Sequence, residues 1–170
     1  MALFALATFA GALEPDQIQI AYELKMGTRE ISGVSHELEW TVLAVDDQSA
    51  QVHLRVPIDS FDSGHPDFDS RLRAALDARQ HPFAEIEGAL RPGHLEGTLD
   101  LRGVKRPVSI QLTIERVAGN LIAAGSFAID LSDYGVELEG VDPHASIDLV
   151  VRLVAAPGVV LAGGFTRQSN

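Results

Sequence analysis

A histidine and two aspartates separated by single residues are the clearest candidates for chemistry in this sequence. His65, Asp67 and Asp69 carry nitrogen and oxygen groups, and a metal ion would need three or four such groups at one point. His81 or His94 could join them after folding, which would give a hydrolase assisted by a metal or by His65. The interpretation that the sequence favours is a polar loop in which Asp67 or Asp69 caps the following helix.

Other catalytic arrangements are sparse. Ser35 precedes His36, but neighbouring residues of a strand point to opposite faces, so they cannot form a nucleophile and its base. Carboxylates pair at Asp46-Asp47 and at Asp130 with Asp133, positions typical of hairpin tips and strand ends. The sequence contains no G-x-S-x-G elbow, P-loop, G-x-G-x-x-G or H-E-x-x-H motif. We therefore predict a protein that is not an enzyme, with no catalytic residues, no cofactor and no bound metal.

Length and charge exclude several classes of partner. The 170 residues predict one domain. Thirteen basic and 24 acidic residues give a net charge of −11, the opposite sign to that needed for phosphate binding, so we expect no nucleic-acid partner. There is no cysteine, which excludes disulfides, a thiolate nucleophile and thiolate-bound metals. No run of 18 apolar residues occurs, so we expect no transmembrane span.

The first twelve residues differ from the rest of the chain. An uncharged apolar stretch ends in Ala10-Gly11-Ala12, as in the hydrophobic region and cleavage site of a secretory signal, but the basic region is missing. We interpret residues 1–12 as a truncated signal segment and predict a periplasmic or exported protein. A cytoplasmic location is the alternative.

The elements that would position functional residues follow from a period of two. Apolar and polar residues alternate in the runs 18–24, 34–42, 51–58, 95–102, 108–115, 126–131 and 147–153. Such runs are typical of antiparallel strands with one buried face, and the short connections favour hairpins. Residues 69–78 predict one short helix between strands four and five, with Asp69 near its start. Residues 156–170 predict a flexible C-terminal tail.

About eight such strands predict an all-β fold. Closure into a barrel removes the sheet edges, although a sandwich would satisfy the same alternation. A barrel interior of this size is either filled by side chains or holds one small ligand, and periodicity does not distinguish the two. The large side chains that we predict to line or gate the interior, each with plain core packing as its alternative, are Trp40, Phe61, Phe68, Leu72, Phe83, Phe127, Ile129 and Tyr134.

One hairpin carries a resemblance to a known family. Residues 97–108 read G-x-L-x-L-x-G-V-x-R-P-V, which resembles the hairpin signature of the YceI-like family of bacterial lipocalin-like proteins. The segments 31–33, 56–64, 76–83 and 133–136 are similar to other family segments and follow in the family's order, so the matches span about residues 18–155. Phe68 stands where family members usually carry an arginine before the aspartate at position 69, and the first strand also departs from the family's pattern.

The resemblance implies an antiparallel lipocalin-like β-barrel over residues 15–155, with a helical segment near one opening. It also implies non-enzymatic binding, transport or sequestration of a long apolar ligand, such as a polyisoprenoid, a quinone or a fatty-acid derivative. The resemblance likewise implies export to the periplasm and possible pairing as a homodimer. The alternative is a filled barrel that acts as an interaction module for a membrane or respiratory partner, suggested by the acidic surface and the apolar segment 159–161.

Overall fold

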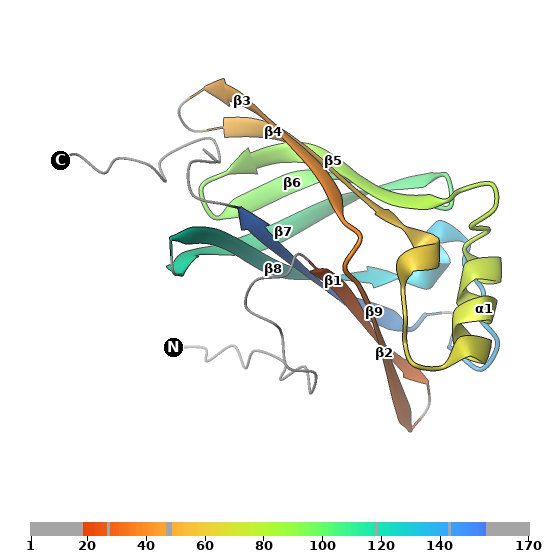
Figure 1. The fold of residues 1–170 in the computed structure, drawn as a ribbon. Helices are drawn as coiled ribbons and strands as arrows, with labels where there is room; N and C mark the ends of the chain where they lie inside the picture. The colour runs from red at the N-terminus through yellow and green to blue at the C-terminus, as the bar shows by residue number, and fades with distance from the viewer. Residues whose placement is uncertain (1–18, 27, 47–48, 118, 143, 156–170) are drawn as a thin grey trace, which may run out of the picture.

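The computed structural model describes residues 19–26, 28–46, 49–117, 119–142 and 144–155. Within these residues nine antiparallel strands form one sheet in the order β2-β1-β9-β8-β7-β6-β5-β4-β3 (Figure 1). The strands are β1 (Gln19–Met26), β2 (Arg29–Ser35), β3 (Glu39–Asp46), β4 (Ser49–Pro57), β5 (Phe83–Arg91), β6 (His94–Leu101), β7 (Val104–Val117), β8 (Asn120–Asp130) and β9 (Ser146–Ala155). The predicted signal segment and tail lie outside the described residues.

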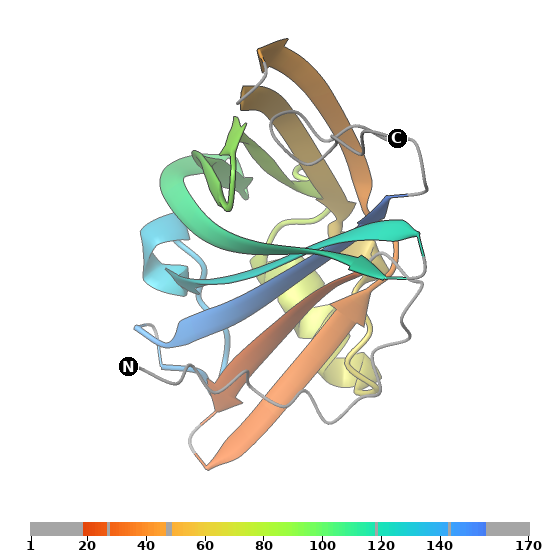
Figure 2. The same cartoon turned by 90° about the vertical axis from the view of Figure 1, so that its left-hand side faces the viewer.

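The predicted fold class is confirmed, with two corrections. There are nine strands rather than about eight, because the predicted run 34–42 is broken between Ser35 and Glu39 into β2 and β3. The sheet curls into a half-barrel (Figure 2) whose edge strands are β2 and β3. The described part of the chain forms no ladder between these edges, so the predicted closure is wrong. The outer side of β2 makes one isolated bridge, in which Val34 and Asp62 exchange two backbone hydrogen bonds of 3.0 Å.

Two opposed glycines allow the sheet to curl where β5 meets β6. Gly88 pairs directly with Gly97, and both lie on the inward parity of their strands, between buried residues such as Leu90 and Leu95. A Cβ on Gly97 would lie 2.8 Å from the Cα of Gly88, and one on Gly88 would lie 2.7 Å from the Cα of Gly97. Glycine kinks of this kind let strands approach and coil, so this pair contributes directly to the half-barrel shape.

The α-helix formed by the described residues lies between β4 and β5, as predicted, but it begins earlier. α1 (Pro66–Ala75) starts with Pro66 in its first turn, where the missing N–H costs no helical hydrogen bond. The residue before it, His65, makes no side-chain capping bond. The predicted capping by Asp67 or Asp69 is wrong, because both residues lie inside the helix, and the Asp69 carboxylate accepts hydrogen bonds from Ser63. Both acidic residues do lie in the first turn, at the positive end of the helix dipole.

The core lies between the inward face of the sheet and the elements at one open end of the half-barrel (Figure 1). Phe68 and Leu72 of α1 pack there, and Phe68 is only 2% exposed. The short 3₁₀ helices η1 (Ile58–Ser60) and η2 (Leu131–Tyr134) add further buried side chains. None of the described helices is long and apolar enough to cross a membrane.

The edge strand β3 carries apolar side chains that are exposed to solvent. Leu43 and Val45 are 64% and 61% exposed, and both lie on the parity of β3 that faces away from the core. Trp40, on the other parity, is half-buried and packs against the core.

Candidate functional site

An apolar cavity of about 80 Å³ lies inside the half-barrel, beneath α1. Its walls come from β1, β4, β5, β6, β8 and β9, from α1, and from both 3₁₀ helices. Arg55 is the one charged residue among the lining residues. Its guanidinium lies 3.7 Å from the ring centroid of Phe83, and its Nε lies 3.3 Å from a Glu39 carboxylate oxygen, so the cation has an aromatic and an anionic partner. The cavity surface is therefore suited to hydrocarbon.

A second apolar cavity of about 30 Å³ lies further along the half-barrel. Leu54 and Val151 line both cavities, so the two spaces are neighbours separated by little more than these side chains. Ile114, Ala123 and Leu153 line the second cavity, and Trp40 packs against this group. The interior thus holds two small neighbouring apolar cavities rather than one continuous space.

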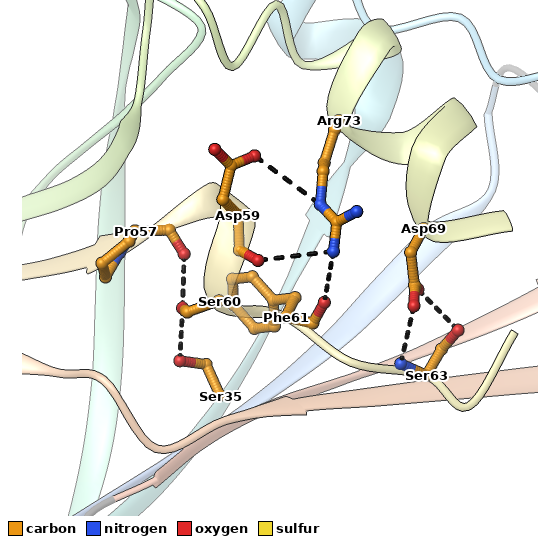
Figure 3. Close-up of polar contacts among 8 residues, drawn as sticks. All are labelled: Ser35, Pro57, Asp59, Ser60, Phe61, Ser63, Asp69 and Arg73. Atoms are coloured by element: carbon orange, nitrogen blue, oxygen red, sulfur yellow. Dashed lines mark hydrogen bonds and ion pairs between the residues drawn. The ribbon is translucent and has the colours of Figure 1, made fainter. Parts of the chain in front are cut away.

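Polar contacts hold α1 against η1 and the loop that follows it (Figure 3). Arg73 of the helix donates to the carbonyl oxygens of Asp59 and Phe61, both at 3.4 Å, and pairs with the Asp59 carboxylate at 3.6 Å. Asp69, only 5% exposed, accepts from the Ser63 hydroxyl at 2.6 Å. These contacts fix the helix that covers the larger cavity.

A second chain of hydrogen bonds ties this loop region to β2 (Figure 3). The Ser60 hydroxyl donates to the Pro57 carbonyl at 2.6 Å, so the Ser35 hydroxyl must donate to Ser60, also at 2.6 Å. The backbone N–H of Glu37 donates to Ser35 in turn. The break between β2 and β3 is therefore anchored by a buried serine.

Four of the eight predicted lining residues face the larger cavity: Phe61, Leu72, Phe127 and Ile129. The other four lie elsewhere. Phe68 is buried in the core and Trp40 packs beside the second cavity. Phe83 is covered by Arg55, and Tyr134 is buried in η2 beside another pocket on the outside of the sheet. Phe68, at the position of the family's arginine, has Arg71 above its ring at 5.8 Å.

Most of the cavity lining is aliphatic, and for that reason most of it was not predicted from the sequence. The alternation of apolar and polar residues was the signal that could have identified these lining residues. It places Ile20, Leu24, Ile147 and Leu149 on the inward parity. Tyr22 was also missed, although it is 4% exposed and packs edge-on against Phe61 with ring centroids 5.5 Å apart.

Tyr22 lies over a glycine of the neighbouring strand. It pairs directly with Gly33, and a Cβ on Gly33 would lie 2.5 Å from Cζ and 2.6 Å from the hydroxyl oxygen of the tyrosine. An aromatic side chain that covers a cross-strand glycine stabilises the pair and fixes its own ring. The glycine is thus required for the position of the ring in the cavity wall.

Replacing Gly33 with alanine is expected to destabilise the protein by about 1–2 kcal/mol, because the new methyl group displaces the Tyr22 ring. In a Tyr22→Leu background the same substitution should cost less than about 0.5 kcal/mol, since the obstructing ring is gone. Urea denaturation of the four proteins in this cycle measures the coupling. Additive effects would show that the ring and the glycine do not constrain each other.

Burial raises the pKa of the Tyr22 hydroxyl above its ordinary value of 10.0, and the Asp69 carboxylate adds to the shift. The hydroxyl makes no hydrogen bond with the described residues; the nearby Ser63 hydroxyl donates to Asp69 instead. Burial and Asp133 likewise raise the pKa of Tyr134. Both tyrosines therefore stay neutral in the folded protein at a pH where the unfolded chain ionises.

The free energy of unfolding is accordingly expected to fall as the pH rises above about 10, by up to about 1.4 kcal/mol per pH unit for each tyrosine that stays neutral. Tyr22→Phe should remove one tyrosine's share of this decline while changing stability by less than about 1 kcal/mol at neutral pH. Urea denaturation between about pH 9 and pH 11 measures the difference. Equal declines in the two proteins would show that Tyr22 ionises freely in the folded state.

The outer face of the sheet brings a serine and a carboxylate to one histidine. The Nε2 of His94 lies 3.3 Å from both the Ser109 hydroxyl and Glu96 Oε1, while Gln111 contacts Nδ1 at 2.9 Å. In a catalytic triad the acid and the nucleophile use opposite ring nitrogens. Here they share one nitrogen, so the group has the composition of a triad without its geometry.

The predicted metal candidates are also not brought together. Asp69 is turned to Ser63, and the described residues contain no cluster of three or more histidine or carboxylate side chains placed to hold a metal ion.

Comparison with known proteins places this arrangement in context. A family model described as the YceI-like domain matches residues 12–155. No curated protein matches the sequence significantly.

Several solved structures share the fold. BcnA of Burkholderia cenocepacia is 17% identical, with a TM-score of 0.68, over 82% of this chain and 96% of that one. A polyisoprenoid binding domain from Saccharophagus degradans is 16% identical, with a TM-score of 0.65, over 82% and 94% of the two chains. The YceI protein of Campylobacter jejuni is 13% identical, with a TM-score of 0.63, over 91% and 98%. At these identities the similarity concerns the fold.

Proposed function

This chain belongs to the YceI-like domain family, and from that premise we propose that it binds a long apolar chain inside its half-barrel without catalysing a reaction. The resemblance predicted from the hairpin at residues 97–108 is confirmed by the family match. The observation that carries the proposal is the interior itself: two neighbouring cavities whose walls are almost wholly hydrocarbon. Each buried methylene would contribute about 0.8 kcal/mol.

The ligand class that we propose is a polyisoprenoid, a quinone side chain or a fatty-acid derivative. The polyisoprenoid binding domain of Saccharophagus degradans has a similar fold, which supports this class. Periplasmic transport or sequestration and pairing of two copies complete the proposal. Cell fractionation tests the location, and light scattering on the purified protein tests the pairing.

The single tryptophan offers a direct test of binding. Trp40 packs beside the second cavity, so a long-chain fatty amide brominated in mid-chain should quench its fluorescence when the chain enters. The matching amide without bromine should displace the probe and restore the signal. The Trp40→Phe variant, which has no tryptophan, controls for background emission. Absence of saturable quenching would count against the proposal.

Native mass spectrometry supplies a second measurement on the same protein. Protein purified from cells should carry a discrete added mass, and denaturing extraction should release a lipid. A clean mass without ligand, both before and after incubation with isoprenoids and fatty acids, would overturn the proposal.

One observation favours the alternative function, a filled half-barrel that acts as an interaction module. Pockets for drug-sized ligands usually measure about 300–1,000 Å³, whereas the larger cavity measures about 80 Å³. A long chain could enter only if side chains such as Leu54 and Val151 move apart. If the mass and fluorescence measurements both show an empty protein, a pull-down from solubilised membranes tests this second function.

A further inference from the structure

The strands β7 and β8 pair along only part of their length. Their ladder runs from the Gln111–Ser126 pair to the Val117–Asn120 pair. Residues 104–110 of β7 continue alongside β6, and residues 127–130 of β8 continue alongside β9. Within the described residues the sheet therefore forks beyond Gln111 and Ser126.

The register shows which backbone groups face this fork. The N–H of Leu112 donates to the carbonyl of Gly93 at 2.9 Å, on the β6 side. Because backbone groups alternate in direction along a strand, those of Ser109 and Pro107 point towards β8. If the β7–β8 register continued, Ala128 would lie opposite Ser109, and Asp130 would lie opposite Pro107. Proline has no N–H to satisfy, which suits it to such an edge.

A pocket of about 250 Å³, here called the outer pocket, occupies the fork. Pro107, Ser109, Ala128 and Asp130 line it, together with Arg106 and Asp133. Its remaining walls include Phe127 and Ile129, which also line the larger interior cavity. These two residues therefore lie between a polar space outside the sheet and an apolar space inside it. An amphipathic molecule could extend from one space into the other past them.

The charges around the outer pocket disfavour an anion. Arg106 supplies one positive charge, and its Nε–H already donates to the Asp133 carbonyl at 3.0 Å. Asp130 and Asp133 supply two negative charges. The Asp130 carboxylate accepts from the hydroxyl and the N–H of Ser132 at 2.7 and 2.8 Å, and these bonds lower its pKa. The exposed strand edges at Ser109 and Ala128 offer both a donor and an acceptor, which suits a neutral polar group.

We infer that the outer pocket binds the head group of the ligand, and that this head group is an uncharged hydrogen-bonding group such as an amide or a hydroxyl. The apolar chain then passes Phe127 and Ile129 into the interior cavity. The inference rests on the proposed function, because it concerns the polar end of the same ligand.

Two matched cysteine variants test the location of the head group. The chain has no cysteine, so Ala128→Cys and Ala124→Cys can each be labelled at one position with a bulky maleimide. Both positions are on the outward parity of β8, but Ala128 lines the fork and Ala124 is paired with Thr113. Labelling Ala128→Cys should weaken binding of the brominated fatty amide about tenfold, as expected from the loss of one or two hydrogen bonds. Labelling Ala124→Cys should leave binding unchanged.

A charge variant tests the class of head group. The brominated fatty acid with the same chain should bind more weakly than the amide at a pH where the acid is ionised. Asp133→Asn should strengthen binding of the acid relative to the amide about two- to fivefold, the usual range for an exposed charge. Because asparagine has nearly the same size and shape as aspartate, both proteins should fold equally well.

The outcomes separate this inference from the proposed function. If neither probe quenches Trp40 in the unmodified protein, the proposed function fails. If both probes quench but the label on Ala128→Cys has no effect, the head group lies elsewhere and the inference is overturned while the proposed function stands. If the label blocks binding but Asp133→Asn does not change the affinity of the acid relative to the amide, the assigned class of head group is wrong.

Discussion

Replacing Gly97 with alanine is expected to lower the free energy of unfolding by about 3–4 kcal/mol, the largest effect of any single methyl group that we predict in this protein. The added Cβ would press on the Glu87 carbonyl and lie 2.8 Å from the Cα of Gly88. Both obstacles are backbone of the paired strand, so no side-chain rotation relieves the contact. The strands must move apart, and the ladder between β5 and β6 must weaken.

Urea denaturation monitored by circular dichroism measures this loss. Thr98→Ala, at the next position of β6, is the matched control, because it changes a side chain on the other face without adding an atom near Gly88. It should cost less than about 1 kcal/mol. If Gly97→Ala folds too poorly for denaturation to be measured, its soluble yield should still be lower than that of Thr98→Ala expressed under the same conditions. Equal stability of the two variants would contradict the role of the glycine pair in the curl of the sheet.

The second large effect concerns binding rather than stability. Ala84 lies at the start of β5 and lines the larger cavity. Replacing it with leucine should place an isobutyl group in the space of about 80 Å³ and weaken binding of the brominated fatty amide about tenfold. Exclusion of two methylene groups from the interior, at about 0.8 kcal/mol each, accounts for a loss of this size. Saturation of Trp40 quenching measures it.

Ala89→Leu is the matched control, because it makes the same substitution on the outward parity of the same strand. It should leave binding unchanged. Filling the cavity should leave the stability of Ala84→Leu within about 1.5 kcal/mol of the original protein. A much larger loss of stability would mean that the leucine does not fit the cavity, and unchanged binding would mean that the ligand does not occupy it.

The sequence predicted the elements of this fold well because alternation directly reports which face of a strand is buried. It predicted the antiparallel hairpins and the helix between β4 and β5 for the same local reasons. The edges of the sheet were harder to predict. The break at Ser35 depends on a hydrogen bond to Ser60, which lies 25 positions away. The curl depends on two glycines that meet only when β5 and β6 pair. Neither contact leaves a local signature.

The candidate site was predicted in part for a related reason. The size of large aromatic residues predicts that they line an interior, yet Phe83 packs under Arg55 and Tyr134 lies beside the outer pocket. The cavity wall is mainly aliphatic, and its residues differ from ordinary core residues only because their side chains border a cavity instead of another side chain. That distinction is set by the spacing of whole elements, which the residue pattern of one strand does not contain.

The open edge at β3 has a consequence for the behaviour of the protein in concentrated solution. Within the described residues β3 pairs only with β4. A strand edge that carries exposed apolar side chains, here Leu43 and Val45, is a template for another strand. The net charge of −11 opposes such contacts between copies by mutual repulsion. Salt shortens the range of that repulsion to about 10 Å at 0.1 M. Colloidal stability of this chain therefore depends on its charge, and it should be greatest in buffers of low ionic strength.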